Sequence, residues 1–266
     1  MTKVKIALVD FRDQFSIIIM MKHTMQIVAL VILIGFIDCT DQTNELTGDG
    51  IVTVGIYADD GASGICYIAA ENMFKWMGFE TRRIYASTIN NDDFEHVDIF
   101  YFPGGSYGNA ISDSGLQMLR DAIASGRGYM GTCGGAHFAR YLGVFPGVVT
   151  GPVPGLGIEM CEVYLVKPHP ITDDQPANLW ILYYNSPYFL PDSGATVDTI
   201  GFYNISGYPA LVACEYGTGR VFLTGPHPEW EEDDDRDGVS AYDNFDDVES
   251  DWPMMHNAAR WCLYDL

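Results

Sequence analysis

Short apolar runs alternate with longer amphipathic segments in the region that begins at residue 51. Two short apolar runs, at residues 51–57 and 97–102, are rich in β-branched and aromatic residues, as buried parallel strands are. Residues 80–85, which follow a helix-ending Gly78, predict a further strand between them. Two segments that follow such runs place apolar side chains at helical spacing and cover residues 62–77 and 112–125. This alternation predicts the α/β class, with a doubly wound, mostly parallel sheet flanked by helices in a single domain at 51–266.

The pattern becomes less regular after residue 140. Glycine and proline interrupt residues 141–191, where 161–166 predicts a strand. Residues 209–216 and 220–224 predict a hairpin across a Gly-Thr-Gly turn, and residues 252–266 predict a closing helix. The segment 181–189 is rich in aromatic residues, which fits either an edge strand or the border of a pocket.

A candidate nucleophile follows another short apolar run, at residues 128–132. Residues 128–132 lead into Cys133-Gly134-Gly135 and then into a helix-forming segment, which is the strand–turn–helix pattern of a strained nucleophile elbow. Gly131 and Gly135 suit the close approach of chains that such an elbow requires. The N–H of Gly134 would open the helix toward the reacting centre, where the helix dipole also favours a thiolate. We therefore interpret Cys133 as a nucleophile rather than as a buried structural cysteine.

A second motif lies far downstream. The β-rich run at 220–224 breaks at Gly-Pro and is followed by His227-Pro-Glu229. A histidine placed there can accept the thiol proton, and a carboxylate two residues later can fix its tautomer. Gly104 and Gly105 directly follow the third predicted strand, at the edge where an open α/β sheet binds ligands through bare backbone N–H groups. The sequence thus predicts the parts of a thiol active site at one edge of the sheet.

The two motifs, Gly-Thr-Cys-Gly-Gly and Gly-Pro-His-Pro-Glu-Trp, resemble those of the class I glutamine amidotransferase-like superfamily, which has a flavodoxin-like fold. They are most similar to its biotin–protein ligase N-terminal-domain-like branch, and the resemblance extends from about residue 51 to the C-terminus. It implies a catalytic triad, two oxyanion donors and a set of residues in the substrate pocket. The implied triad is Cys133, His227 and Glu229, and the implied oxyanion donors are Gly105 and Gly134. The implied pocket residues are Gly104, His137, Tyr184 and Asn185.

One position departs from the superfamily pattern. Glutaminase domains usually carry glutamine four residues after the nucleophile, and this chain has His137 there, which argues against glutamine as the substrate. We therefore expect a thiol-dependent amidase or hydrolase that acts on a small-molecule or amide substrate and needs no cofactor or metal. Two alternatives remain, namely a non-catalytic binding or accessory module on the same fold and a glutamine amidotransferase that depends on a partner protein.

Charge and cysteine content narrow the classes of partner. The formal net charge of −22 disfavours binding to nucleic acid or to an anionic membrane surface. Six cysteines in 266 residues form no CxxC metal site and no dense disulfide framework. In an oxidising compartment, four of them could still pair, and these are Cys66, Cys161, Cys214 and Cys262.

An acidic stretch near the C-terminus resembles the opening of a calcium loop. Asp233, Asp235 and Asp237 stand at alternate positions and are followed by Gly238. The twelfth position of such a loop, where a bidentate glutamate is usual, is Asn244. We therefore interpret the stretch as a solvated acidic insert.

Residues 1–50 are expected to form a leader. Their apolar part, 17–38, contains an uninterrupted apolar run at 27–37, and a polar linker follows it. This shape is typical of a signal peptide or membrane anchor, and Cys39 is a candidate for lipidation. We expect an exported or membrane-anchored protein, or a cytoplasmic one if the segment is part of the fold. The candidate start sites are Met1, Met20, Met21 and Met25. The oligomeric state stays open.

Overall fold

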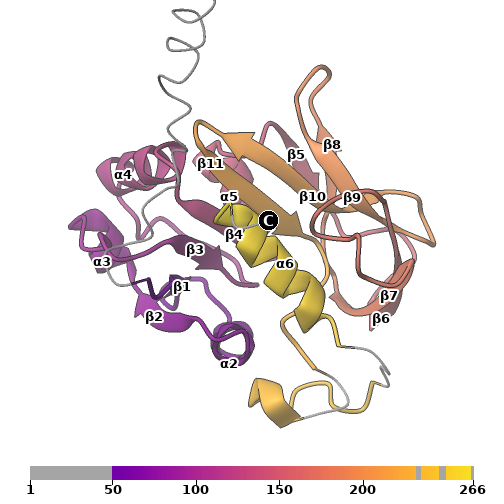
Figure 1. The fold of residues 1–266 in the computed structure, drawn as a ribbon. Coiled ribbons are helices and arrows are strands. Elements are labelled where there is room, and N and C mark those ends of the chain that lie inside the picture. The colour runs from indigo at the N-terminus through magenta and orange to yellow at the C-terminus, as the bar shows by residue number, and fades with distance from the viewer. Residues whose placement is uncertain (1–49, 232–234, 246–249, 265–266) are drawn as a thin grey trace, which may run out of the picture. The chain divides into compact units, whose positions relative to one another are not determined.

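A computed structural model describes residues 50–231, 235–245 and 250–264, which form a single domain around one nine-stranded sheet (Figure 1). The sheet order is β2-β1-β3-β4-β11-β10-β9-β6-β7. Its strands are β1 (Thr53–Tyr57), β2 (Glu80–Ile84), β3 (Ile99–Phe102), β4 (Gly128–Thr132), β6 (Ile158–Leu165), β7 (Asn178–Tyr184), β9 (Asp198–Tyr203), β10 (Pro209–Tyr216) and β11 (Gly219–Thr224). Strands β5 (Gly147–Thr150) and β8 (Tyr188–Pro191) form a separate pair. The helices are α2 (Gly64–Trp76), α3 (Ala86–Asn90), α4 (Asp113–Ala124), α5 (Gly134–Leu142) and α6 (Trp252–Cys262), with a short 3-10 turn η1 (Asp235–Asp237).

The sheet has a parallel half and an antiparallel half. Strands β2, β1, β3, β4 and β11 run parallel to one another. From β11 onward, β10, β9, β6 and β7 pair antiparallel. The α/β class and the β10–β11 hairpin are confirmed, but the sheet is mixed, so the expected mostly parallel character holds for its first half. The difference arises because the irregular segment after residue 140 supplies strands that extend the sheet beyond the hairpin.

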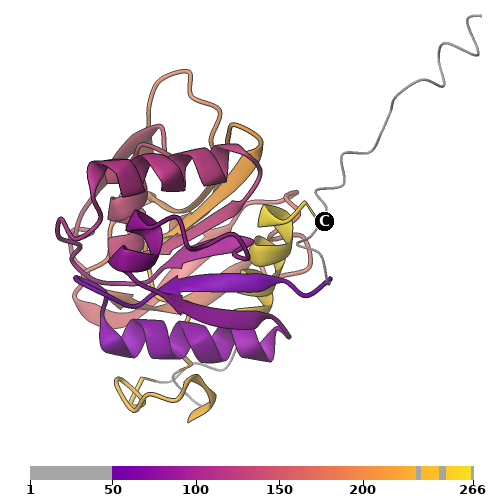
Figure 2. The same ribbon diagram turned by 90° about the vertical axis from the view of Figure 1, so that its left-hand side faces the viewer.

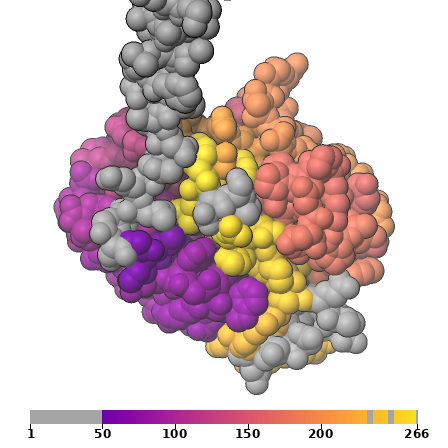
Figure 3. All heavy atoms as spheres, viewed as in Figure 1, coloured from indigo at the N-terminus to yellow at the C-terminus, as the bar shows by residue number. Residues whose placement is uncertain are grey.

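Helices cover both faces of the sheet (Figure 2). Helices α2 and α6 pack on one face, where Phe74 and Met255 join the core. Figure 3 shows α6 in yellow at the surface of this side, between the purple N-terminal elements and the salmon strands. Helices α3, α4 and α5 cover the other face through residues such as Leu119 and Phe138. Because β3, β4 and β11 are parallel neighbours, their carboxyl ends lie side by side at one edge.

Asp237 anchors the described part of the acidic insert. Its Oδ1 accepts the Val239 N–H at 2.9 Å, and its Oδ2 accepts the Glu231 N–H at 3.2 Å. Its backbone carbonyl accepts a hydrogen bond from the Asn72 side chain of α2 at 2.7 Å. The carboxylate is therefore occupied by backbone donors and holds a turn against α2. Asp233, which would share a cation with it, lies outside the described residues.

Burial raises the pKa of Asp237 to about 6, and the charges of Asp243 and Glu231 act in the same direction. A carboxyl group whose pKa is raised by folding stabilises the fold below the unfolded pKa and loses that contribution as pH rises through the folded pKa. Between pH 4 and 7, the wild type is expected to lose about 1 to 2 kcal/mol of unfolding free energy relative to Asp237→Asn, after allowance for solvent screening. Urea unfolding of both proteins at several pH values measures this difference. Parallel pH profiles of the two proteins would contradict the expectation.

The expected leader, with its apolar segment and Cys39, lies outside the described residues. None of the helices in the described ranges is both long enough and apolar enough to span a lipid bilayer. Export, anchoring and lipidation therefore stay predictions from the sequence.

Candidate active site

Cys133 lies on a sharp turn between β4 and α5. Its backbone has φ 49° and ψ −102°, a left-handed conformation that costs a non-glycine residue of order 1–3 kcal/mol. The turn is held from both sides, because the Cys133 N–H donates to the Thr224 carbonyl at 2.9 Å and its own carbonyl accepts the N–H groups of Ala136 and His137. The thiol-bearing residue is only partly buried. The structure thus places Cys133 in the elbow geometry that the sequence predicted.

The glycines around the elbow are required by close backbone contacts. A Cβ on Gly135 would lie 1.8 Å from the Phe102 carbonyl oxygen. A Cβ on Gly131 would lie 2.8 Å from the carbonyl group of Gly135. No side chain fits at either position, so the sequence pattern reflects packing of the turn against β3 and α5.

His227 reaches the same edge from β11. Its backbone N–H donates to the Leu182 carbonyl at 2.8 Å, which fixes the loop after the strand. Its ring stacks on Trp230 with centroids 4.6 Å apart, and its Nδ1 lies 2.8 Å from the Glu229 carboxylate. The side chains of His227 and Glu229 are nearly inaccessible to solvent. Since Nδ1 is bonded to Glu229, the ring nitrogen left for proton exchange is Nε2, which has no hydrogen-bond partner within the described ranges.

The protonation of His227 is set by its neighbours. Burial lowers its pKa, but the Glu229 carboxylate and then the Cys133 thiol outweigh that effect and raise the pKa well above its usual value. The nearby Cys66 thiol acts in the same direction. The folded protein therefore favours an imidazolium at His227, close to the sulfur atoms of Cys133 and Cys66.

Gly105 and Gly134 bring two backbone N–H groups together. A Cβ on Gly134 would lie 2.5 Å from the Gly105 nitrogen, so the two backbones are in direct contact. On either side of Gly105, the Ser106 N–H donates to the Gly61 carbonyl at 2.7 Å, and the Gly104 carbonyl accepts the Ser63 N–H at 2.9 Å. Within the described ranges, the N–H groups of Gly105 and Gly134 donate to no protein acceptor. Two unpaired donors beside the thiol can hold a negatively charged oxygen.

A cavity of about 420 Å³ opens beside the thiol and the histidine. Cys133 and His227 line it, and so do Gly104, Gly105, Tyr184 and Asn185, as the sequence predicted. Gly104 has to be glycine, because a Cβ there would lie 2.6 Å from the His227 ring. Six further lining residues are Ser63, Ile65, Cys66, Ser106, Trp230 and Tyr242.

Two residues of this cavity, Tyr242 and Trp230, were given no role by the sequence analysis. Tyr242 comes from the acidic insert and stacks on Trp230 at 5.4 Å. Trp230 directly follows the His-Pro-Glu motif, and its place there was the one available signal for a pocket role. Tyr184 is the last residue of edge strand β7, so both alternatives for the aromatic segment hold at this residue.

Cys66 is a second thiol at the site. It lies on α2 with its Sγ 3.9 Å from Nδ1 of His227. Burial raises the pKa of Cys66, and the residue is only 2% exposed. It therefore stays protonated and screened from solvent, whereas Cys133 is the partly accessible thiol on the elbow. The five cysteines in the described residues are free, so the disulfides considered for an oxidising compartment are not formed in the structure.

Cys66, His227 and Glu229 could also hold a metal ion. One ligand atom from each lies within 4.8 Å of the other two, and Glu229 Oε2 has no hydrogen-bond partner in the described part of the chain. Thiolate, imidazole and carboxylate are donors that suit Zn²⁺. A metal at Nδ1 would break the bond between His227 and Glu229, so it would inhibit acid–base chemistry at His227 rather than assist it.

Zn²⁺ is therefore expected to slow alkylation of Cys133, and chelation by EDTA should restore the rate. A Cys66→Ser variant should need at least about tenfold more Zn²⁺ for the same inhibition, because it lacks the soft ligand. Cys214→Ser, at a buried thiol that does not line the cavity, serves as the control. Equal zinc sensitivity of the Cys66 variant and the wild type would exclude this donor set.

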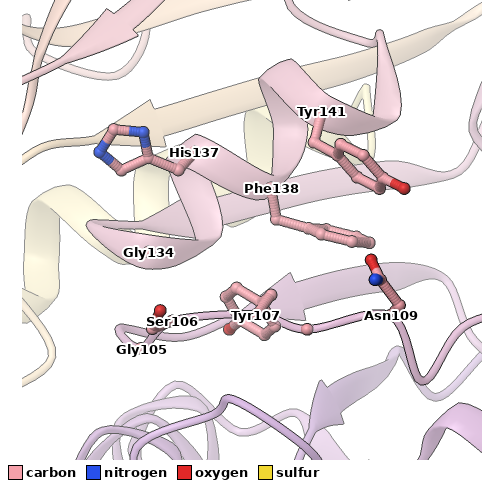
Figure 4. Close-up of a pocket in the computed structure, with 9 residues that line it drawn as sticks. Gly105, Ser106, Tyr107, Asn109, Gly134, His137, Phe138 and Tyr141 are labelled. Atoms are coloured by element: carbon pink, nitrogen blue, oxygen red, sulfur yellow. The ribbon is translucent and has the colours of Figure 1, made fainter.

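His137 lies apart from the other predicted pocket residues. It lines a second cavity of about 280 Å³ between α5 and the loop after β3 (Figure 4). Gly105 and Ser106 line both cavities, so the two adjoin at the oxyanion donors. The second cavity also contains Tyr107, Asn109, Gly134, Phe138 and Tyr141.

Several known structures have a fold similar to that of this chain, at low sequence identity. No family model matches the chain. A glutamine amidotransferase from Thermotoga maritima matches with a TM-score of 0.59 at 12% identity, covering 80% of this chain and 98% of that one. The structure of PurLQS from the same organism matches with a TM-score of 0.57 at 17% identity, covering 79% and 99%.

A curated relative matches in sequence over part of its length. The biotin–protein ligase of Schizosaccharomyces pombe is 24% identical over 212 residues, which are 67% of this chain and 33% of the ligase. This chain thus spans about a third of that relative. The fold is that of the class I glutamine amidotransferase-like proteins, and the partial match to a biotin–protein ligase gives weaker support to the biotin–protein ligase-like branch.

Proposed function

We propose that the protein is a thiol-dependent acyl-transfer enzyme of the amidase or hydrolase type. The observation that carries this proposal is the meeting of an elbow cysteine, the histidine of a buried His–Glu pair and the Gly105 N–H in one cavity, with the Gly134 N–H in the adjoining cavity. Cys133 would be the nucleophile, His227 the acid and base, and Glu229 the group that orients His227. Gly105 and Gly134 would be the oxyanion donors.

The reaction follows from these positions. The Cys133 sulfur attacks the carbonyl carbon, and the carbonyl electron pair moves to the oxygen held by Gly105 and Gly134. As the tetrahedral intermediate collapses, the bond to the leaving group breaks and Nε2 of His227 delivers a proton to that group. The proton that His227 delivers is the one it took from the Cys133 thiol. Water then attacks the thioester carbonyl and loses a proton to His227, and the C–S bond breaks to release the acid. His227 returns that proton to the Cys133 sulfur, so the cycle balances.

Cys133 is a better candidate for the nucleophile than Cys66. Both sulfur atoms influence His227, but Cys66 Sγ approaches Nδ1, the nitrogen already engaged by Glu229. Burial also keeps Cys66 in the neutral thiol form.

A burst experiment with p-nitrophenyl acetate tests the proposal. The wild type should release one equivalent of p-nitrophenol per protein rapidly, and intact-mass spectrometry should show a single acetyl group on Cys133. Cys133→Ala should give no burst, whereas Cys66→Ala should retain it. Absence of any acetylated Cys133 would contradict the proposal and favour a non-catalytic binding module.

A further inference from the structure

We infer that the second cavity binds the acyl part of the substrate and selects a neutral, aromatic acyl group. This inference rests on the proposed function and names the substrate class of that site. It is carried by the position of the cavity relative to the two N–H donors and by the chemistry of its lining.

The two cavities adjoin at the place where the carbonyl oxygen would sit. Both contain Gly105 and Ser106, but Cys133 and His227 line only the first, while Gly134 lines only the second. A carbonyl carbon bonded to Cys133, with its oxygen on the N–H groups of Gly105 and Gly134, therefore has one cavity on each side.

The position of His227 determines which substituent of the carbonyl carbon lies in which cavity. The leaving group must lie next to Nε2 of His227 to receive its proton, so it belongs in the first cavity. The remaining substituent of the carbonyl carbon is the acyl chain. It is directed along Gly134 into the second cavity.

The second cavity offers no charged partner for an ionic acyl group. The residues that line it include no Arg, Lys, Asp or Glu. Partial burial lowers the pKa of His137, so its ring is neutral at pH 7 and cannot pair with a carboxylate. Gly108 also lines the second cavity, and Asp60 Oδ2 lies 2.5 Å from the position that a Cβ on Gly108 would take, so this boundary carries negative charge. A free α-carboxylate, such as that of glutamine, would lie there without a counter-ion.

The wall of the second cavity is aromatic. Figure 4 shows Phe138 and Tyr141 projecting from α5 toward the loop that carries Tyr107 and Asn109. Phe138 lies 5.3 Å from Tyr107 and 6.1 Å from Tyr141, measured between ring centroids. The Tyr107 hydroxyl donates to the Pro103 carbonyl at 2.6 Å, which fixes that ring before any ligand arrives. A rigid aromatic wall of this kind favours a planar apolar group.

The size of the cavity agrees with an aryl group on a short linker. Its volume of about 280 Å³ is roughly twice the ~150 Å³ that suffices for benzene in an engineered protein cavity. The Asn109 side chain stands at the far end of the aromatic wall in Figure 4, and within the described residues it forms no hydrogen bond. It is therefore free to bond a polar atom on the ring of the acyl group.

Three p-nitrophenyl esters that share one leaving group test the inference. They are the phenylacetate, the acetate and the monoglutarate, which carry an aromatic, a small and a negatively charged acyl group. Acylation of Cys133 is followed by p-nitrophenol release and intact mass, and each rate is divided by the rate of the same ester with free N-acetylcysteine. We expect phenylacetyl transfer to exceed acetyl transfer at least about tenfold, as burial of a phenyl ring allows, and glutaryl transfer to be the slowest.

Variants at Tyr141 assign the preference to the second cavity. Its side chain is 62% exposed, so replacement costs little folding stability. Tyr141→Ala should reduce the phenylacetyl-to-acetyl ratio about fivefold, whereas Tyr141→Phe should retain the ratio because the ring remains. A ratio that Tyr141→Ala leaves unaltered would overturn the assignment.

The other outcomes separate the two proposals. If Cys133 is acylated with a normalised phenylacetyl-to-acetyl ratio near one, the substrate class is wrong and the proposed function stands. If glutarate is the fastest ester, the site selects an anion and the inference is also wrong. If none of the three esters acylates Cys133, the proposed function fails and the inference fails with it.

Discussion

Replacing His227 with alanine is expected to slow acylation of Cys133 by p-nitrophenyl acetate at least about 100-fold. General acid–base catalysis by a positioned histidine is worth about 10² to 10⁴ in rate. His227 is the group in the cavity whose pKa is raised by Glu229 and Cys133, so its loss removes both the proton carrier and the charge beside the sulfur. Stopped-flow measurement of p-nitrophenol release gives the acylation rate directly.

Two controls separate this chemical role from a structural one. Added imidazole should restore part of the rate in His227→Ala, since removal of a buried ring leaves space for it. His96→Ala removes an exposed histidine that pairs with Glu95 at 3.1 Å, and it should leave the rate unchanged. A loss of less than threefold in His227→Ala would exclude His227 as the acid and base.

Gly135→Ala is expected to lower the unfolding free energy by about 3 kcal/mol or more. The added Cβ would lie 1.8 Å from the Phe102 carbonyl oxygen, and both partners are backbone, so relief requires α5 to move away from β3. For a domain of this length, that loss corresponds to a fall of roughly 6 to 12 °C in melting temperature.

Gly157→Ala is the matched control for that variant. No heavy atom lies within 4 Å of the Cβ that it would add, so the change in unfolding free energy should stay within about 0.5 kcal/mol. Differential scanning calorimetry of both variants gives the comparison. Equal melting temperatures for the two would mean that the elbow does not pack against β3 as described.

The parallel half of the fold could be predicted because its signals are local. Strands β1 and β3 are short apolar runs, and Gly78 and Gly126 follow α2 and α4, two of the helices that connect the strands. The elbow at Cys133 was equally clear, since its glycines are needed for contacts that a Cβ would prevent. Such signals depend on residues that are close in the sequence and not on contacts between segments that are far apart in it.

The antiparallel half and part of the site could not be predicted for the same reason. Strand β9 (Asp198–Tyr203) is formed by a segment with several polar residues, and it becomes a strand because β10 and β6 flank it. Cys66 looks like one of several apolar residues on α2, and only the fold brings it to His227. Tyr242 reaches the cavity from an acidic insert whose composition suggested a solvated surface loop.

Alkylation by iodoacetamide at pH 7 tests the central claim, that Cys133 is the activated thiol of this site, most directly. Intact mass and peptide mapping are followed over time for the wild type, Cys133→Ala and Cys66→Ala. We expect one fast label on Cys133, lost in Cys133→Ala and retained in Cys66→Ala, because Cys66 is buried and protonated. Fast labelling that survives in Cys133→Ala and disappears in Cys66→Ala would contradict the assignment, and uniformly slow labelling of all thiols would contradict the presence of an activated nucleophile.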